Sequence, residues 1–146
     1  MPLVKQGRIT TDLFVHVADG AELPGDGAIL IPAARFLEDP RHHIAVALDD
    51  GLVVGFATAV HYINPDKPPE LWINEVGVAA SHRRRGCGKK LLSALFRAGR
   101  RLGCVEAWVL TEPANTAALR LYRSAGGARK RTPSVMFEFR LRRKKR

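Results

Sequence analysis

Arginine and glycine stand side by side in the segment of this chain best suited to bind an anion. Arg83, Arg84 and Arg85 are followed by Gly86 and Gly88, and an apolar helical repeat begins directly behind them. Glycine lets backbone amides approach a ligand, and a helix N-terminus adds unpaired amides and a partial positive charge. Arginine adds paired donors that match phosphate oxygens. The segment therefore predicts a pyrophosphate-binding turn.

A Gly-x-Gly pair at the start of a helix is not specific by itself. The segment lacks the Lys-Ser/Thr ending of a P-loop and the third glycine of the dinucleotide-binding fingerprint. The alternative interpretation is a helix entry with a solvated basic face. Other parts of the chain must decide between the two.

Hydrophobic spacing predicts the elements that position this turn. A central strand leads into it, and a helix stopped by Gly103 follows it. Upstream, an Asp-Gly turn joins the two strands of a hairpin. The order indicates a mixed α/β domain in which helices cover a sheet. The expected strands are 13–17, 44–48, 52–62, 71–78, 105–110 and 135–139, and the expected helices are 32–37, 86–102 and 115–125.

Length and composition favour one domain over residues 1–146 with a basic tail at 140–146. The chain has 146 residues, of which 46% are hydrophobic and 26% are charged. No run approaches the ~18 apolar residues of a membrane span, and no secretory leader is evident. Two cysteines are too few for a disulfide scaffold, so we expect a reducing cytoplasm.

The net charge of +10 is distributed unevenly. Residues 1–80 hold 5 Lys and Arg against 11 Asp and Glu, whereas residues 81–146 hold 19 against 3. A uniformly basic nucleic-acid binder would not show this division. It fits one anionic and one cationic ligand.

Two motifs make the chain resemble the GCN5-related N-acetyltransferases over roughly residues 12–140. Arg83, Gly86 and Gly88 fill the family's Arg/Gln-x-x-Gly-x-Gly/Ala signature, behind a strand that ends at Val78. Downstream, the segment that starts at Asn115 matches the family's Asn-x-x-Ala-x-x-x-Tyr-x-x-x-Gly pattern. Two motifs in the expected order identify the chain as a member of that family.

The resemblance implies acetyl-CoA as co-substrate, bound in the cleft after the fourth strand of the family's fold, a mixed and mostly antiparallel sheet flanked by helices. It also implies that the pantetheine arm pairs with the backbone around Val76 and Val78, and that Tyr122 protonates the departing thiolate. A core tyrosine with a satisfied hydroxyl is the alternative for Tyr122. The implied coenzyme-binding residues are Val76, Val78, Arg83, Arg84, Arg85, Gly86, Cys87, Gly88, Lys89, Asn115, Ala118 and Tyr122.

An amine must lose a proton before it attacks a thioester, so the site needs a base. Glu75 is the candidate, because alternation along the strand turns it away from Val76 and Val78. Its apolar neighbours Ile73 and Val76 predict partial burial and a raised pKa. A structural carboxylate paired with an arginine is the alternative.

The acceptor is the less defined ligand. Glu70, Asp66 and His61 lie along the loop before the central strand and are candidate substrate residues, with a solvated loop as the alternative. The strand from Glu70 to Val78 is similar to that of the aminoglycoside 3-N-acetyltransferases, which implies an aminoglycoside acceptor and a substrate role for Glu75. A peptide, protein or other small-molecule amine stays open.

Other classes of function are less favoured. No His, Cys, Asp or Glu cluster has metal-ligand spacing, so no metal is expected, and Cys87 fills a variable place in the family motif. A nucleic-acid-binding module is a distant alternative, because no aromatic residues interleave the basic clusters. Neither nucleic acid nor membrane is an expected partner. A homodimer is an expectation from the family alone.

Overall fold

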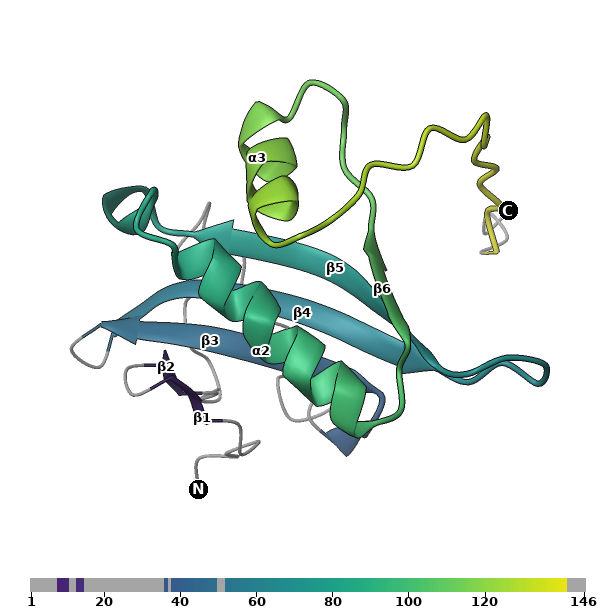
Figure 1. Cartoon of the computed structure of the whole chain (residues 1–146), viewed down its shortest axis with the longest axis horizontal. Coiled ribbons are helices and arrows are strands. Elements are labelled where there is room, and N and C mark those ends of the chain that lie inside the picture. Colours follow the sequence, from purple (N-terminus) through teal and green to yellow (C-terminus); the bar gives the residue numbers. More distant parts are fainter. Residues whose placement is uncertain (1–7, 11–12, 15–35, 37, 50–51, 142–146) are drawn as a thin grey trace, which may run out of the picture.

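The computed structural model describes residues 8–10, 13–14, 36, 38–49 and 52–141. A four-stranded sheet runs in the order β3-β4-β5-β6 and carries a long helix on one face, with a shorter helix near its edge (Figure 1). Strands β3, β4 and β5 are antiparallel, whereas β6 runs parallel to β5. The elements are β1 Arg8–Thr10, β2 Leu13–Phe14, β3 His42–Asp49, β4 Leu52–Tyr62, β5 Glu70–Val78, η1 Ala80–His82, α2 Cys87–Arg101, β6 Glu106–Val109 and α3 Thr116–Ser124.

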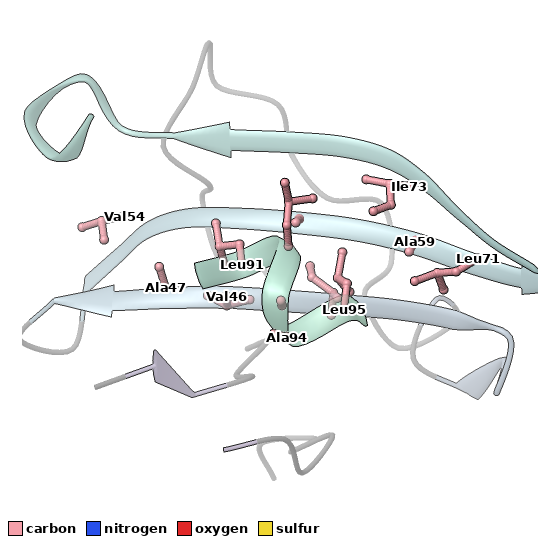
Figure 2. Close-up of a cluster of buried hydrophobic side chains, with 13 residues drawn as sticks. Val46, Ala47, Val54, Ala59, Leu71, Ile73, Leu91, Ala94 and Leu95 are labelled. Carbon is pink, nitrogen blue, oxygen red and sulfur yellow. The ribbon is translucent and has the colours of Figure 1, made fainter. Parts of the chain in front are cut away.

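Small residues on one face of β4 let α2 lie close to the sheet. In β4, Gly55, Ala57 and Ala59 alternate with larger side chains, so the small residues share one face. A Cβ atom added to Gly55 would lie 3.2 Å from Cδ1 of Leu91 in α2. The leucines of α2 fill the resulting space and are almost fully buried (Figure 2). This core holds the start of α2 against the end of β5.

A bulge interrupts the pairing of β4 with β5. Thr58 pairs with Glu75 and Ala59 pairs with Ile73, so Asn74 has no partner on β4. An extra residue reverses the alternation of side chains beyond it. Glu75 therefore faces away from α2, whereas Ile73 points toward it.

Strands β5 and β6 separate after a short stretch of pairing. Residues 70–73 of β5 pair with residues 106–109 of β6, and β6 then leads away toward α3 (Figure 1). Among the described residues, no strand pairs with residues 74–78 of β5 on that side. The last part of β5 thus has a free backbone edge beside the start of α2.

Most of the predicted elements are confirmed to within two residues. The hairpin, the central strand, the two later helices and the strand near residue 106 all form. Of the predicted strand 13–17, residues 13–14 form β2 and the others lie outside the described residues, as does nearly all of the predicted helix 32–37. Within the described part of the chain, no helix is both long and apolar enough to span a membrane.

The predicted strand at 135–139 is wrong. Residues 127–141 form no helix or strand, and Val135, Met136, Phe137 and Phe139 are at least 76% exposed. An alternating apolar pattern is sufficient for a strand only where another strand satisfies its backbone donors and acceptors. In this structure the segment runs away from the sheet (Figure 1).

Candidate active site

The turn before α2 presents unpaired backbone amides. The first hydrogen bond of the helix joins the Lys90 amide to the Gly86 carbonyl at 3.0 Å, so the amides of Cys87, Gly88 and Lys89 lie ahead of the helix's own ladder. Within the described part of the chain, no side chain caps this end, and the first turn of the helix holds no acidic residue. Such an N-terminus can bind a phosphate group.

Left-handed backbone shapes the same turn. Gly86 has φ 76° and Arg84 has φ 62°. For arginine this conformation is uncommon and costs free energy, which the surrounding contacts must offset. Two such contacts are visible: Arg83 Nε donates to the Val78 carbonyl at 3.2 Å, and His82 Nε2 lies 2.6 Å from Asp49 Oδ2. These two side-chain contacts therefore hold the turn against the ends of β5 and β3.

The second glycine of the motif allows α3 to approach α2. A Cβ atom on Gly88 would lie 3.0 Å from both Cδ atoms of Leu121. Leu121 directly precedes Tyr122, so the packing at Gly88 also positions the tyrosine. The side chains of Arg84, Arg85 and Lys89 are exposed around this contact.

Replacing Gly88 with valine should destabilise the fold by about 1–3 kcal/mol, because the added methyl groups occupy the space of Leu121. The measurement is urea unfolding. Ser93→Val is the matched control, since Ser93 is exposed on the same helix, and it should stay within about 0.5 kcal/mol of the parent chain. Equal losses in the two variants would contradict the close approach of α3.

Helix α3 holds the remaining residues of the motif. Asn115 is its N-cap, and its side-chain oxygen accepts a hydrogen bond from the Ala118 amide at 3.1 Å. Ala118 and Tyr122 lie one turn apart on the helix and are both partly buried. Burial raises the pKa of the Tyr122 hydroxyl, so the group stays protonated in neutral solution. A protonated phenol can serve as a general acid.

Glu75 is exposed, so the predicted partial burial is wrong. The cause is the bulge at Asn74, which turns Glu75 away from Ile73 and the helix-covered core. The predicted orientation opposite to Val76 and Val78 is maintained, because these two valines pack toward the core. Tyr122 also packs against the core, on the α2 side of the sheet. Glu75 and Tyr122 therefore lie on opposite faces of the sheet.

Glu70 is bound by its neighbours at the other end of β5. Its Oε2 accepts hydrogen bonds from the Tyr62 hydroxyl at 2.8 Å and from Asn64 Nδ2 at 3.4 Å, and lies 3.1 Å from Lys67 Nζ. These contacts lower the pKa of the Glu70 carboxyl, and the hydrogen bond from Tyr62 has the largest effect. At about 3.3 Å per residue, Glu70 lies about 26 Å from Val78. Glu70 is thus remote from the turn before α2.

The other candidate substrate residues do not converge on Glu75. His61 Nδ1 lies 2.7 Å from Nε2 of His43, and the pairing of His61 with Leu71 places it on the α2 face of the sheet. Asp66 is exposed in the loop beyond β4. The structure therefore separates His61 from Glu75 by the thickness of the sheet.

Neither an activated Cys87 thiol nor a metal-binding cluster is found among the described residues. Burial raises the pKa of the Cys87 thiol, which faces β4 near Gly55. The thiol therefore stays protonated, contrary to the activation that a helix start can provide. No group of three or more His, Cys, Asp or Glu suited to a metal ion occurs among the residues that the structure describes.

Sequence reasoning missed a tryptophan pair next to Glu75. Trp72 and Trp108 pair across β5 and β6, and their rings stack at a centroid distance of 5.1 Å with 9° between their planes. The two residues are 36 positions apart in the chain, so only the register of a parallel strand pair brings them together. The available signal was one tryptophan at a similar place in each of two predicted strands.

Comparison with known proteins gives a consistent group of relatives. The model of the acetyltransferase (GNAT) family matches residues 15–126. Aminoglycoside N(6')-acetyltransferase type 1 of Salmonella typhimurium is 34% identical over 115 residues, which cover 76% of this chain and 70% of that protein. L-2,4-diaminobutyric acid acetyltransferase of Shouchella clausii is 42% identical over 80 residues, 53% of this chain and 43% of that protein.

Solved structures of aminoglycoside acetyltransferases are also similar to this chain. Aminoglycoside N-acetyltransferase AAC(6')-Iy in complex with CoA has a TM-score of 0.65 and 28% identity, covering 73% of this chain and 82% of that one. The aminoglycoside acetyltransferase meta-AAC0020 from an uncultured soil metagenomic sample, in complex with sisomicin, has a TM-score of 0.68 and 25% identity. That similarity covers 74% of this chain and 71% of the metagenomic one.

Proposed function

This chain belongs to the acetyltransferase (GNAT) family and uses acetyl-CoA as its co-substrate, and from that premise we propose that it acetylates an amine of an aminoglycoside. One observation supports the proposal above the others. The free edge of β5 adjoins the unpaired amides of α2, and a carboxylate faces out from the same stretch of strand. This arrangement can accommodate a donor and an acceptor at one point of the sheet.

The residues present fit the coenzyme. The amides of Cys87, Gly88 and Lys89 would hold its pyrophosphate, with Arg84 and Arg85 adding charge at the surface. The backbone at Val76 and Val78 would pair with the pantetheine arm, as an added strand pairs with a sheet edge. Ala118 and Tyr122 would border the arm on the α3 side. Asn115 would contribute by capping α3, since its side-chain oxygen is engaged there.

Acetyl-CoA supplies a thioester, whose carbonyl carbon the acceptor nitrogen attacks. Glu75 would take a proton from the acceptor's ammonium group, either directly or through a water molecule, on the face away from α2, and the neutral amine would then attack. Tyr122 would give its proton to the departing thiolate on the other face. The two proton transfers would thus take place on opposite sides of the free edge of β5.

The distribution of charged side chains favours a cationic acceptor. Glu70, Glu75 and Glu106 all lie on the face opposite α2, whereas the turn before the helix carries Arg83, Arg84 and Arg85. The acidic face would attract a cationic acceptor, and the basic turn would attract the anionic coenzyme. The two relatives named for aminoglycoside N(6')-acetylation support the 6'-amine, whereas the resemblance to the 3-N-acetyltransferases implies the 3-amine. Product analysis must therefore distinguish the two positions.

Incubation of the protein with acetyl-CoA and a panel of aminoglycosides should release thiol only when an aminoglycoside is present. Mass spectrometry should find one added acetyl group, and fragmentation should assign it to the 6'- or the 3-amine. The panel includes 2,4-diaminobutyric acid, because one relative is named for it, and a lysine peptide. Turnover of the amino acid or the peptide without any turnover of an aminoglycoside would overturn the proposal.

A further inference from the structure

The face of the sheet opposite α2 carries, beside its acidic side chains, aromatic ones that the chemistry proposed above leaves without a role. Trp72 and Glu70 of β5 lie there beside Trp108 and Glu106 of β6, because paired residues of neighbouring strands share a face. Tyr62 of β4 pairs with Glu70 and joins the same face. We call Trp72 and Trp108 the tryptophan platform.

Hydrogen bonds hold the tryptophan platform in one orientation. Trp108 Nε1 donates to the Tyr62 hydroxyl at 2.8 Å, and that hydroxyl donates to Glu70 Oε2 at 2.8 Å. Glu70 is held in turn by Lys67. The stacked rings of Trp72 and Trp108 extend this network to the surface. A preorganised surface loses little conformational freedom when a ligand binds.

One indole ring of the platform is open to solvent. Trp72 is 38% exposed, whereas its stacking partner Trp108 is less exposed. An aromatic face attracts cations and offers a flat apolar surface. Glu70 and Glu106 add negative charge beside the rings. The combination suits a ring-shaped ligand with several ammonium groups.

The bulge at Asn74 brings the proposed base onto the same face. Without an extra residue, positions 72 and 75 of a strand would point to opposite faces of the sheet. With Asn74 unpaired, Trp72 pairs with Val60 and Glu75 pairs with Thr58, and these two β4 residues share a face. Trp72 and Glu75 are therefore neighbours along β5, about 7–10 Å apart at the Cα atoms.

We propose that the tryptophan platform is the floor of the acceptor site, on which an amino sugar binds and directs its reactive amine toward Glu75. This inference rests on the proposed function for the identity of the acceptor. It assigns a specificity role to Trp72 through ring and cation contacts. Trp108, Tyr62 and Glu70 act as positioning residues that hold Trp72 in place.

Tryptophan fluorescence reports on this site alone, since Trp72 and Trp108 are the chain's two tryptophans. We expect titration with an aminoglycoside, excited at 295 nm and without coenzyme, to change the emission in a saturable way. The matched ligand is 2-deoxyglucose, an uncharged sugar, which should give no saturable change at the same concentrations. Coenzyme A alone should also leave the emission unchanged, because its expected site is on the other side of β5.

Replacing Trp72 separates aromatic contact from apolar area. Trp72→Leu should raise the KM for the aminoglycoside roughly tenfold, and Trp72→Phe should raise it by less than about threefold, because only phenylalanine retains an aromatic face. The KM for acetyl-CoA and the thermal unfolding midpoint should be unchanged in both. Phe137→Leu is the matched control at an exposed aromatic outside the platform, and it should alter none of these values.

The outcomes of the two experiments are distinct. Turnover of aminoglycosides without a fluorescence change, or with an unchanged KM in Trp72→Leu, would overturn the platform and leave the proposed function intact. A saturable fluorescence change without turnover would support the platform and contradict the proposed function. Absence of both turnover and fluorescence change would overturn both.

Discussion

Glu75→Gln should lower kcat/KM for the acceptor by about 10²–10⁴, the scale expected for loss of a general base. The amide keeps the shape of the side chain and removes its ability to take a proton. Coenzyme binding should be unaffected, because Glu75 faces away from α2 and from the turn that carries the unpaired amides. The measurement combines steady-state kinetics with the Kd for coenzyme A.

Glu138→Gln is the control for the charge change. Glu138 is exposed in the segment beyond α3, so its replacement should leave kcat/KM within about twofold of the parent. A loss in Glu75→Gln that comes only from KM would assign Glu75 to acceptor binding through charge. A silent Glu75→Gln would transfer the proton-accepting role to another group.

Tyr122→Phe should lower kcat at saturating acetyl-CoA by about 10² if the phenol protonates the departing thiolate. Burial raises the pKa of Tyr122 above its ordinary value of about 10. A general acid acts below its pKa, so the contribution of Tyr122 should persist through neutral and mildly alkaline solution and be lost only above pH ~10. Phenylalanine retains the ring that packs against the core.

The pattern of change separates this role from packing. We expect kcat to fall while the thermal unfolding midpoint and the Kd for coenzyme A stay close to those of the parent chain. A lowered midpoint with unchanged kcat would mean that Tyr122 only packs α3 against the core. The kinetic deficit should not depend on which aminoglycoside is used, since Tyr122 would act on the leaving group that all acceptors share.

Local pattern determined much of this protein from sequence alone. The apolar spacing of Leu91, Leu92 and Leu95 sets the face that α2 buries, and the two glycines mark where that helix begins. The hairpin could also be predicted locally, because its strands β3 and β4 follow each other in the sequence. Helices and hairpins are recognisable because the residues that stabilise them are close in the chain. The anion-binding turn could be predicted for the same reason.

Pairing between segments that are far apart in the sequence decided the other features of the candidate site. The bulge at Asn74 depends on the register of β5 against β4, and it exposes Glu75 on the face that Trp72 shares. The register of β5 against β6 stacks Trp72 on Trp108, and the divergence of these strands frees the backbone edge beside α2.

The segment at 135–139 is the converse case, in which a strand-like pattern pairs with no strand among the residues that the structure describes. Side-chain alternation has a period of two, so one extra residue exchanges the faces of everything beyond it. The residue types able to bind and transfer protons are therefore encoded locally. Which of them meet on one face of the sheet is decided by the tertiary structure.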